Sequence, residues 1–237
     1  MDSLDWGRAI ARACTRVAAC GFVVAATALA PAAAQPPAAE SLLAMIAPLP
    51  NETPVGFFIG VIGAGIGARP GDAELCRWAL EDWVRQADGR IEIVPAPEAE
   101  ARLRIIFVEP SFGQYGEMRA VLVDGVRGAE VFIRPDTDAL GRDIASAARA
   151  DPLLRETIVY LTCLHEIGHA LGLEHTADFA DIMYFFGFGG DIPAFFGRYR
   201  ERLASREDIP AQSGLSAGDV ARLRGLWLRR PDGSSAE

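Results

Sequence analysis

The chain has 237 residues, a formal net charge of −9 and 50% hydrophobic residues. Its acidic balance argues against nucleic acid or an anionic membrane surface as a partner, and its apolar content excludes a largely disordered protein. The sequence contains no lysine, which excludes lysine nucleophiles and Schiff-base chemistry.

Residues 1–34 have the pattern of a signal peptide. Three arginines form a basic front, an apolar run extends from Val17 to Ala30, and three alanines at 32–34 resemble a cleavage site. The apolar run is too short to span a bilayer comfortably, so no membrane anchor is expected. The protein is predicted to be exported, either secreted or periplasmic. Cleavage would leave a chain long enough for one domain with a sizeable core.

Residues 35–54 are rich in Pro and Ala and are predicted to form a linker or short pro-segment. A single domain is expected over residues 55–230, with a disordered tail over 231–237. The first strand should run from Val55 to Ile62. The glycine-rich run that follows, from Gly63 to Ala68, resembles a dinucleotide-binding loop, but Arg69-Pro70-Gly71 separates it from the next helix. A turn is therefore preferred there.

A helix is predicted from Asp72, which can serve as its N-cap, to Ala87. Strand-like runs then follow at 91–95, 103–109, 118–123 and 130–134, the last two joined by a hairpin connection over 124–129.

Two cysteines would remain after signal cleavage, Cys76 in this helix and Cys163 later in the chain. In an oxidising compartment they would form a disulfide, and two buried thiols are the alternative.

An acidic stretch precedes the next helix, with aspartates at 136, 138, 143 and 151. Calcium ligands are one interpretation of this stretch. The spacing is not that of an EF-hand, so a solvated acidic loop is preferred and Ca²⁺ is kept as the alternative.

The strongest signal is the run His165-Glu166-Ile167-Gly168-His169-Ala170-Leu171-Gly172-Leu173-Glu174-His175. An apolar stripe at helical spacing leads into it, so His165 and His169, four residues apart, share a helix face. Gly172 can end the helix in a left-handed conformation and let His175 return toward the other two. All three histidines of the chain lie in this motif, which argues against ordinary surface residues. The pattern predicts one catalytic Zn²⁺ with an open fourth position and Glu166 as the catalytic base.

This motif resembles that of the metzincin metallopeptidases, most closely the matrixin-like branch. Asp181-Ile182-Met183-Tyr184 looks like the family's Met-turn, in which a methionine lies beneath the metal, and Leu215 to Trp227 resembles its closing helix. The resemblance covers about residues 55–229. Thr176, where matrixins usually have serine, and a long connection between Met183 and Leu215 depart from the family pattern.

The resemblance implies an α+β fold: a five-stranded mixed twisted sheet, two long helices, a zinc-site helix, a Met-turn and a C-terminal helix. It also implies that Gly172, Met183 and Tyr184 support the site. The stretch from Tyr184 to Tyr199 contains five phenylalanines. It is predicted to be a loop that packs partly on the C-terminal part and partly forms a wall of the substrate pocket.

The implied function is that of an exported zinc-dependent endopeptidase, which hydrolyses peptide bonds with a zinc-bound water and Glu166 as general base. The partner would be a protein or peptide substrate extended along the strand at 118–123. The alternative is a non-proteolytic zinc-binding or adhesion module that retains the fold. An intact Glu166 argues against that module, because a structural site needs no general base. An exported amidase acting on non-peptide substrates is a third interpretation.

Overall fold

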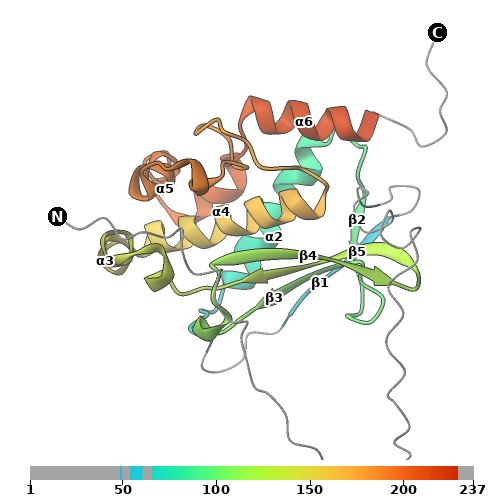
Figure 1. Ribbon diagram of the computed structural model, residues 1–237, viewed down its shortest axis with the longest axis horizontal. Helices are drawn as coiled ribbons and strands as arrows, with labels where there is room; N and C mark the ends of the chain where they lie inside the picture. The colour runs from blue at the N-terminus through green and yellow to red at the C-terminus, as the bar shows by residue number, and fades with distance from the viewer. Residues whose placement is uncertain (1–48, 50–53, 61–65, 229–237) are drawn as a thin grey trace, which may run out of the picture. The chain divides into compact units, whose positions relative to one another are not determined.

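The computed structural model describes residue 49, residues 54–60 and residues 66–228. The predicted signal peptide, most of the predicted linker, the first part of the glycine-rich run and the predicted tail lie outside the described residues. In the described part, one mixed sheet carries helices on one of its faces (Figure 1). This architecture confirms the predicted α+β class.

The sheet has five strands in the order β2-β1-β3-β5-β4. Neighbours are parallel except for β4, which runs antiparallel to β5 and forms one edge. The strands are β1 (Val55–Ile59), β2 (Ile93–Pro95), β3 (Leu103–Phe107), β4 (Gly116–Val123) and β5 (Val126–Ile133). The predicted five-stranded mixed sheet is thus confirmed.

The turn between β4 and β5 is shorter than the sequence indicated. Only Asp124 and Gly125 connect the strands, since Val123 already pairs with Val126. Both connecting residues have positive φ, 51° and 79°, as a two-residue hairpin of type I′ requires. The predicted connection over 124–129 was wrong, because the residues from Val126 onward belong to β5.

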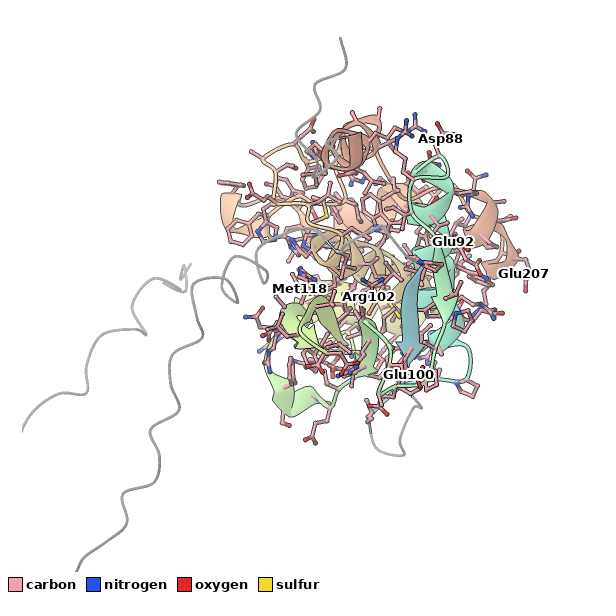
Figure 2. The ribbon with its side chains drawn as sticks, turned by 90° about the vertical axis from the view of Figure 1, so that its right-hand side faces the viewer. Asp88, Glu92, Glu100, Arg102, Met118 and Glu207 are labelled. Carbon is pink, nitrogen blue, oxygen red and sulfur yellow. A yellow bond between two sulfur atoms is a disulfide. The ribbon has the colours of Figure 1, made fainter. Side chains whose placement is uncertain are left out.

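The core lies between the sheet and the helices. Alternate side chains of β3 and β5 are buried on the inner face, where Leu103, Ile105, Val131 and Ile133 are each fully enclosed. Figure 2 shows side chains filling this space, with Met118 labelled on the β4 edge. Leu49, which lies within the predicted linker, is 2% exposed and belongs to the same core cluster.

Two long helices pack on the sheet, α2 (Asp72–Gln86) and α4 (Pro152–Ala170), and the last helix is α6 (Ala217–Leu228). Two shorter helices occupy segments that were expected to be loops, α3 (Arg142–Ala150) and α5 (Ile192–Arg200). Both bury small apolar faces, Ile144, Ala145 and Ala148 in α3 and Phe195, Phe196 and Tyr199 in α5. Tertiary contact with α4 therefore stabilises α3 and α5, although their acidic and glycine-rich sequences do not predict helices.

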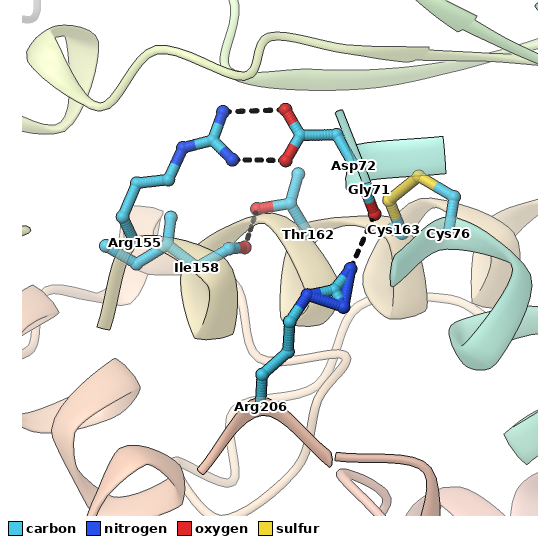
Figure 3. Close-up of a disulfide and its surroundings, with 8 residues drawn as sticks. All are labelled: Gly71, Asp72, Cys76, Arg155, Ile158, Thr162, Cys163 and Arg206. Carbon is cyan, nitrogen blue, oxygen red and sulfur yellow. Dashed lines mark hydrogen bonds and ion pairs between the residues drawn. A yellow bond between two sulfur atoms is a disulfide. The ribbon is translucent and has the colours of Figure 1, made fainter. Parts of the chain in front are cut away.

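Helices α2 and α4 are joined covalently and by buried polar contacts (Figure 3). Cys76 and Cys163 form a disulfide with their Cα atoms 5.2 Å apart. Asp72 forms a two-pronged ion pair with Arg155 instead of capping α2, where Gly71 is the N-cap without a side-chain bond. The predicted capping role of Asp72 was therefore wrong, because its carboxylate is used by Arg155. No helix in the described part of the chain is long and apolar enough to cross a membrane.

Candidate metal centre

Helix α4 carries the histidine motif and has a defined signal at each end. Asp151 caps its N-terminus, because its Oδ1 accepts bonds from the N–H groups of Leu153 and Leu154 at 3.0 and 3.2 Å. At the other end Gly172 has φ 99°, which a glycine adopts without steric cost. There Leu173 N–H donates to the Gly168 carbonyl, and Gly172 N–H donates to that of His169, both at 3.0 Å. These paired bonds turn the chain back toward α4.

The reversal brings the three histidines together. Nε2 of His175 lies 3.3 Å from Nε2 of His165 and 3.1 Å from Nε2 of His169. One ring nitrogen from each of the three residues lies within 4.8 Å of the others. Two nitrogen ligands of a tetrahedral zinc would be about 3.4 Å apart, given zinc–nitrogen bonds of about 2.0–2.1 Å. The spacing of the rings therefore fits one zinc ion.

The orientation of two rings is fixed by backbone carbonyls. His165 Nδ1 donates to the Ile182 carbonyl at 2.7 Å, and His169 Nδ1 donates to that of Leu173 at 2.8 Å. A carbonyl can only accept, so Nδ1 carries the proton in each ring and a neutral ring presents the lone pair of Nε2 to the centre. Converging lone pairs repel one another unless a cation lies between them. The donor set thus suits a metal ion.

Burial keeps the imidazoles in the form that binds metals. It lowers the pKa of His165 to about 3, an effect that His169 increases and the bond to Ile182 opposes. Burial also lowers the pKa of His169 and that of His175. All three rings are therefore neutral at pH 7, as zinc ligands must be.

Within the described residues, these histidines are the only group of three or more His, Cys, Asp or Glu side chains placed to share a metal ion. Three of the four aspartates considered as calcium ligands form ion pairs with arginines. Asp136 pairs with Arg134, Asp138 with Arg149, and Asp151 with Arg200 while it caps α4. These arginines supply the positive charge that a calcium ion would otherwise bring.

Glu166 lies beside the histidines in a cavity of about 410 Å³. The residue is 7% exposed. Burial, and then the charge of Glu117, raise the pKa of Glu166 to about 8. A bound dication would act in the opposite direction, by favouring the charged carboxylate. A buried carboxylate next to a cation site is suited to exchange protons with a bound water or substrate.

The Met-turn lies under α4. Met183 is fully buried, and a Cβ added to Gly168 would lie 2.5 Å from its sulfur, so helix and methionine are in direct contact. Tyr184 is 7% exposed, and its hydroxyl donates to the Gly189 carbonyl at 2.8 Å. The turn runs beside the third histidine, because Thr176 N–H donates to the Met183 carbonyl at 2.8 Å.

Two aspartates that the sequence did not single out as site residues hold this turn in place. Asp181 accepts bonds from the hydroxyls of Thr176 and Ser216. Asp219 accepts the Ile182 N–H at 2.8 Å and forms a reciprocal cap with Ser216 at the start of α6. A serine followed three residues later by an acidic residue is a local pattern typical of a helix start, whereas the link from Asp219 to the Met-turn is a long-range contact.

Aromatic side chains form one wall of the cavity. Phe185 and Phe186 follow the Met-turn, and Phe195 and Phe196 come from α5. The Phe185 ring stacks on His175 with their centroids 4.7 Å apart. The aromatic stretch thus both packs into the core and lines the cavity, but its second half, from Ile192, is a helix rather than the predicted loop.

Comparison with known families agrees with this geometry. Residues 77–188, from within α2 to just past the Met-turn, match the family model described as Matrixin. No curated protein matches the chain. The match favours the enzyme over the non-proteolytic module, because the family is one of zinc metallopeptidases that act on protein or peptide substrates. This match, the mixed sheet and the histidine cluster support a matrixin-like metzincin, and so a zinc metallopeptidase.

Proposed function

We propose that this protein is an exported endopeptidase in which His165, His169 and His175 hold one zinc ion and Glu166 is the general base. The observation that carries the proposal is the convergence of three neutral imidazoles with a buried glutamate in one cavity. Calcium is not part of the proposal, because three of the four candidate aspartates pair with arginines.

When bound, zinc would supply a Lewis acid that polarises a carbonyl and makes water more acidic. Glu166 would take a proton from the attacking water as the new carbon–oxygen bond forms. It would then give that proton to the leaving nitrogen as the carbon–nitrogen bond breaks. Tyr184 and Met183 keep the turn beneath the histidines in place, and Gly172 provides the reversal that brings in His175.

The substrate would lie along the free edge of β4, because among the described strands β4 pairs with β5 alone. The part of β4 that lines the cavity is Gly116–Met118. This is the start of the strand, whereas the sequence pointed to residues 118–123. Backbone pairing there would make binding tolerant of sequence, and the aromatic cavity would select a substrate side chain.

The decisive experiment replaces Glu166→Gln, which keeps the side-chain shape but removes the base. Zinc content, measured by elemental analysis, should stay at one per chain. Hydrolysis of a peptide library should fall by about 10²–10⁴-fold. The matched control is Glu174→Gln, since Glu174 is an exposed carboxylate next to His175 that does not line the cavity. Its activity should equal that of the wild type.

Two results would argue against the proposal. Full hydrolysis by the Glu166→Gln variant would remove the general base from the mechanism. A wild type that binds zinc but cleaves no peptide would favour a binding module, and cleavage of non-peptide amides alone would favour the amidase.

A further inference from the structure

Gly116 is the first residue of β4 and lies where the free edge of the sheet meets the cavity. The N–H of Arg134 donates to the Tyr115 carbonyl at 2.9 Å, and Gly116 is the next residue, opposite Ile133. In an antiparallel ladder the bonded pairs alternate, so the N–H and C=O of Gly116 point away from β5 toward the free edge. Gly116 therefore offers its backbone to whatever binds along that edge.

The side of Gly116 that faces α4 is filled by Glu166. A Cβ added at Gly116 would lie 2.6 Å from Oε1 and 2.9 Å from Cγ of Glu166. It would also lie 2.9 Å from Cγ2 of Thr162, one helical turn earlier. The carboxylate of Glu166 thus occupies the space that any other residue at position 116 would fill.

The backbone gives no other reason for a glycine here. Gly116 is not among the described residues with positive φ, so alanine could adopt its conformation. The contrast with Gly128 on β5 is informative, because a Cβ there would lie 2.7 Å from the Arg102 carbonyl, a backbone atom that cannot move aside. At Gly116 the atoms that would have to move are mainly those of a side chain.

We propose that Gly116 is a positioning residue, whose missing side chain lets the Glu166 carboxylate lie directly against the strand that binds substrate. The inference rests on the proposed function, in which Glu166 is the base. With a methyl group at this position, Glu166 would be pushed away from the edge of β4 while the fold and the three histidines stay in place. The backbone groups that pair with substrate would also be retained.

The test is Gly116→Ala in the full exported protein. We expect kcat to fall by roughly 10²-fold, because a displacement of about 1 Å can have that effect. KM and zinc content should stay at wild-type values. The matched control is Gly197→Ala on α5, where an added Cβ meets nothing within 4 Å, and its kcat should be unchanged.

A double-variant cycle separates positioning from a merely structural role. If Gly116 acts through Glu166, adding Gly116→Ala to the Glu166→Gln variant should cause no further loss of residual hydrolysis. Additive losses, or an unchanged kcat in Gly116→Ala alone, would overturn the proposal. A crystal structure of Gly116→Ala keeps the test independent of activity. A displaced Glu166 carboxylate supports the inference even if the wild type proves to be no peptidase, and an undisplaced one refutes it.

Discussion

At the scale of single residues, the histidine motif also contains a glycine that controls packing. Gly168 lies between His165 and His169, and a Cβ there would be 2.5 Å from the sulfur of Met183 and 3.0 Å from the Trp83 ring. Trp83 in turn donates its Nε1–H to the Leu164 carbonyl at 2.8 Å, directly before His165. The glycine therefore sets how closely the Met-turn and α2 approach the helix that carries the histidines.

Gly168→Ala should destabilise the protein. Overpacking of a filled core costs about 1–3 kcal/mol, which outweighs the gain of up to about 1 kcal/mol for alanine over glycine in a helix. Urea unfolding of the metal-free protein measures the difference. Gly225→Ala on α6 is the control, because its added Cβ meets nothing within 4 Å and should be neutral or slightly stabilising. Equal midpoints for the two variants would contradict the close packing at Gly168.

At the scale of elements, the zinc-site helix is held from one side by α2. The disulfide between Cys76 and Cys163 closes a loop with a sequence separation of 87 residues, and both cysteines are fully buried. Cys163 is two positions before His165, so the crosslink fixes the helix next to its first histidine.

Loss of this disulfide should lower the free energy of unfolding by about 2–5 kcal/mol, since the open chain gains conformational freedom when unfolded. The measurement is urea unfolding of the oxidised and reduced wild type, in which the packing of both sulfurs is kept. The Cys76→Ala, Cys163→Ala double variant should be at least as unstable as the reduced protein. A reduced protein that unfolds at the same urea concentration as the oxidised one would show that the crosslink contributes nothing.

A second link between elements is electrostatic and depends on pH. Burial raises the pKa of Asp181, but the bonds from Ser216 and Thr176 and the charge of Arg222 outweigh it and hold that pKa below its usual value. The ionised carboxylate therefore stabilises the fold above the unfolded pKa of about 3.9, and this contribution is lost as pH falls through the lower folded pKa.

Asp181→Asn tests this link. At pH 6 the variant should be less stable than the wild type by about 1–3 kcal/mol, because charged and hydroxyl donors lose a buried acceptor. Urea unfolding at a series of pH values should show the difference shrinking below about pH 4. A difference that stays constant down to pH 3 would mean that the charge of Asp181 has no part in it.

At the scale of the whole molecule, the stable domain includes a residue from before its predicted start at residue 55. Leu49 is 2% exposed and belongs to the core cluster, although the sequence places it in a linker or pro-segment. Cleavage after Ala34 would keep Leu49, whereas processing near residue 54 would remove it and forfeit about 2–3 kcal/mol of burial energy.

The exported protein should therefore begin at Gln35 and keep Leu49. Mass spectrometry of the protein recovered outside the cytoplasm measures its first residue. An intact Met1 on the exported form would contradict the signal peptide, and a first residue after Leu49 would contradict its place in the stable domain.

The sequence alone predicted which three histidines the structure brings together, because the spacing that places them is local. Four-residue spacing places His165 and His169 on one helix face, and Gly172 is needed where the backbone turns left-handed, so His175 can be assigned without any tertiary contact. The five strands were also predicted from short strand-like runs, because such runs are a local property of the sequence.

Tertiary structure decided what depends on residues far apart in the chain. The sequence predicted that Asp72 caps a helix. In the structure its carboxylate pairs with Arg155, which is 83 positions away. No local pattern joins Asp219 to the Met-turn, or Gly116 to Glu166, since each pair meets only when the sheet, the helix α4 and the C-terminal helix have packed together. Local spacing was enough to predict which atoms are placed to bind a metal. The space around them, including the gap at Gly116 that Glu166 fills, exists only in the packed fold.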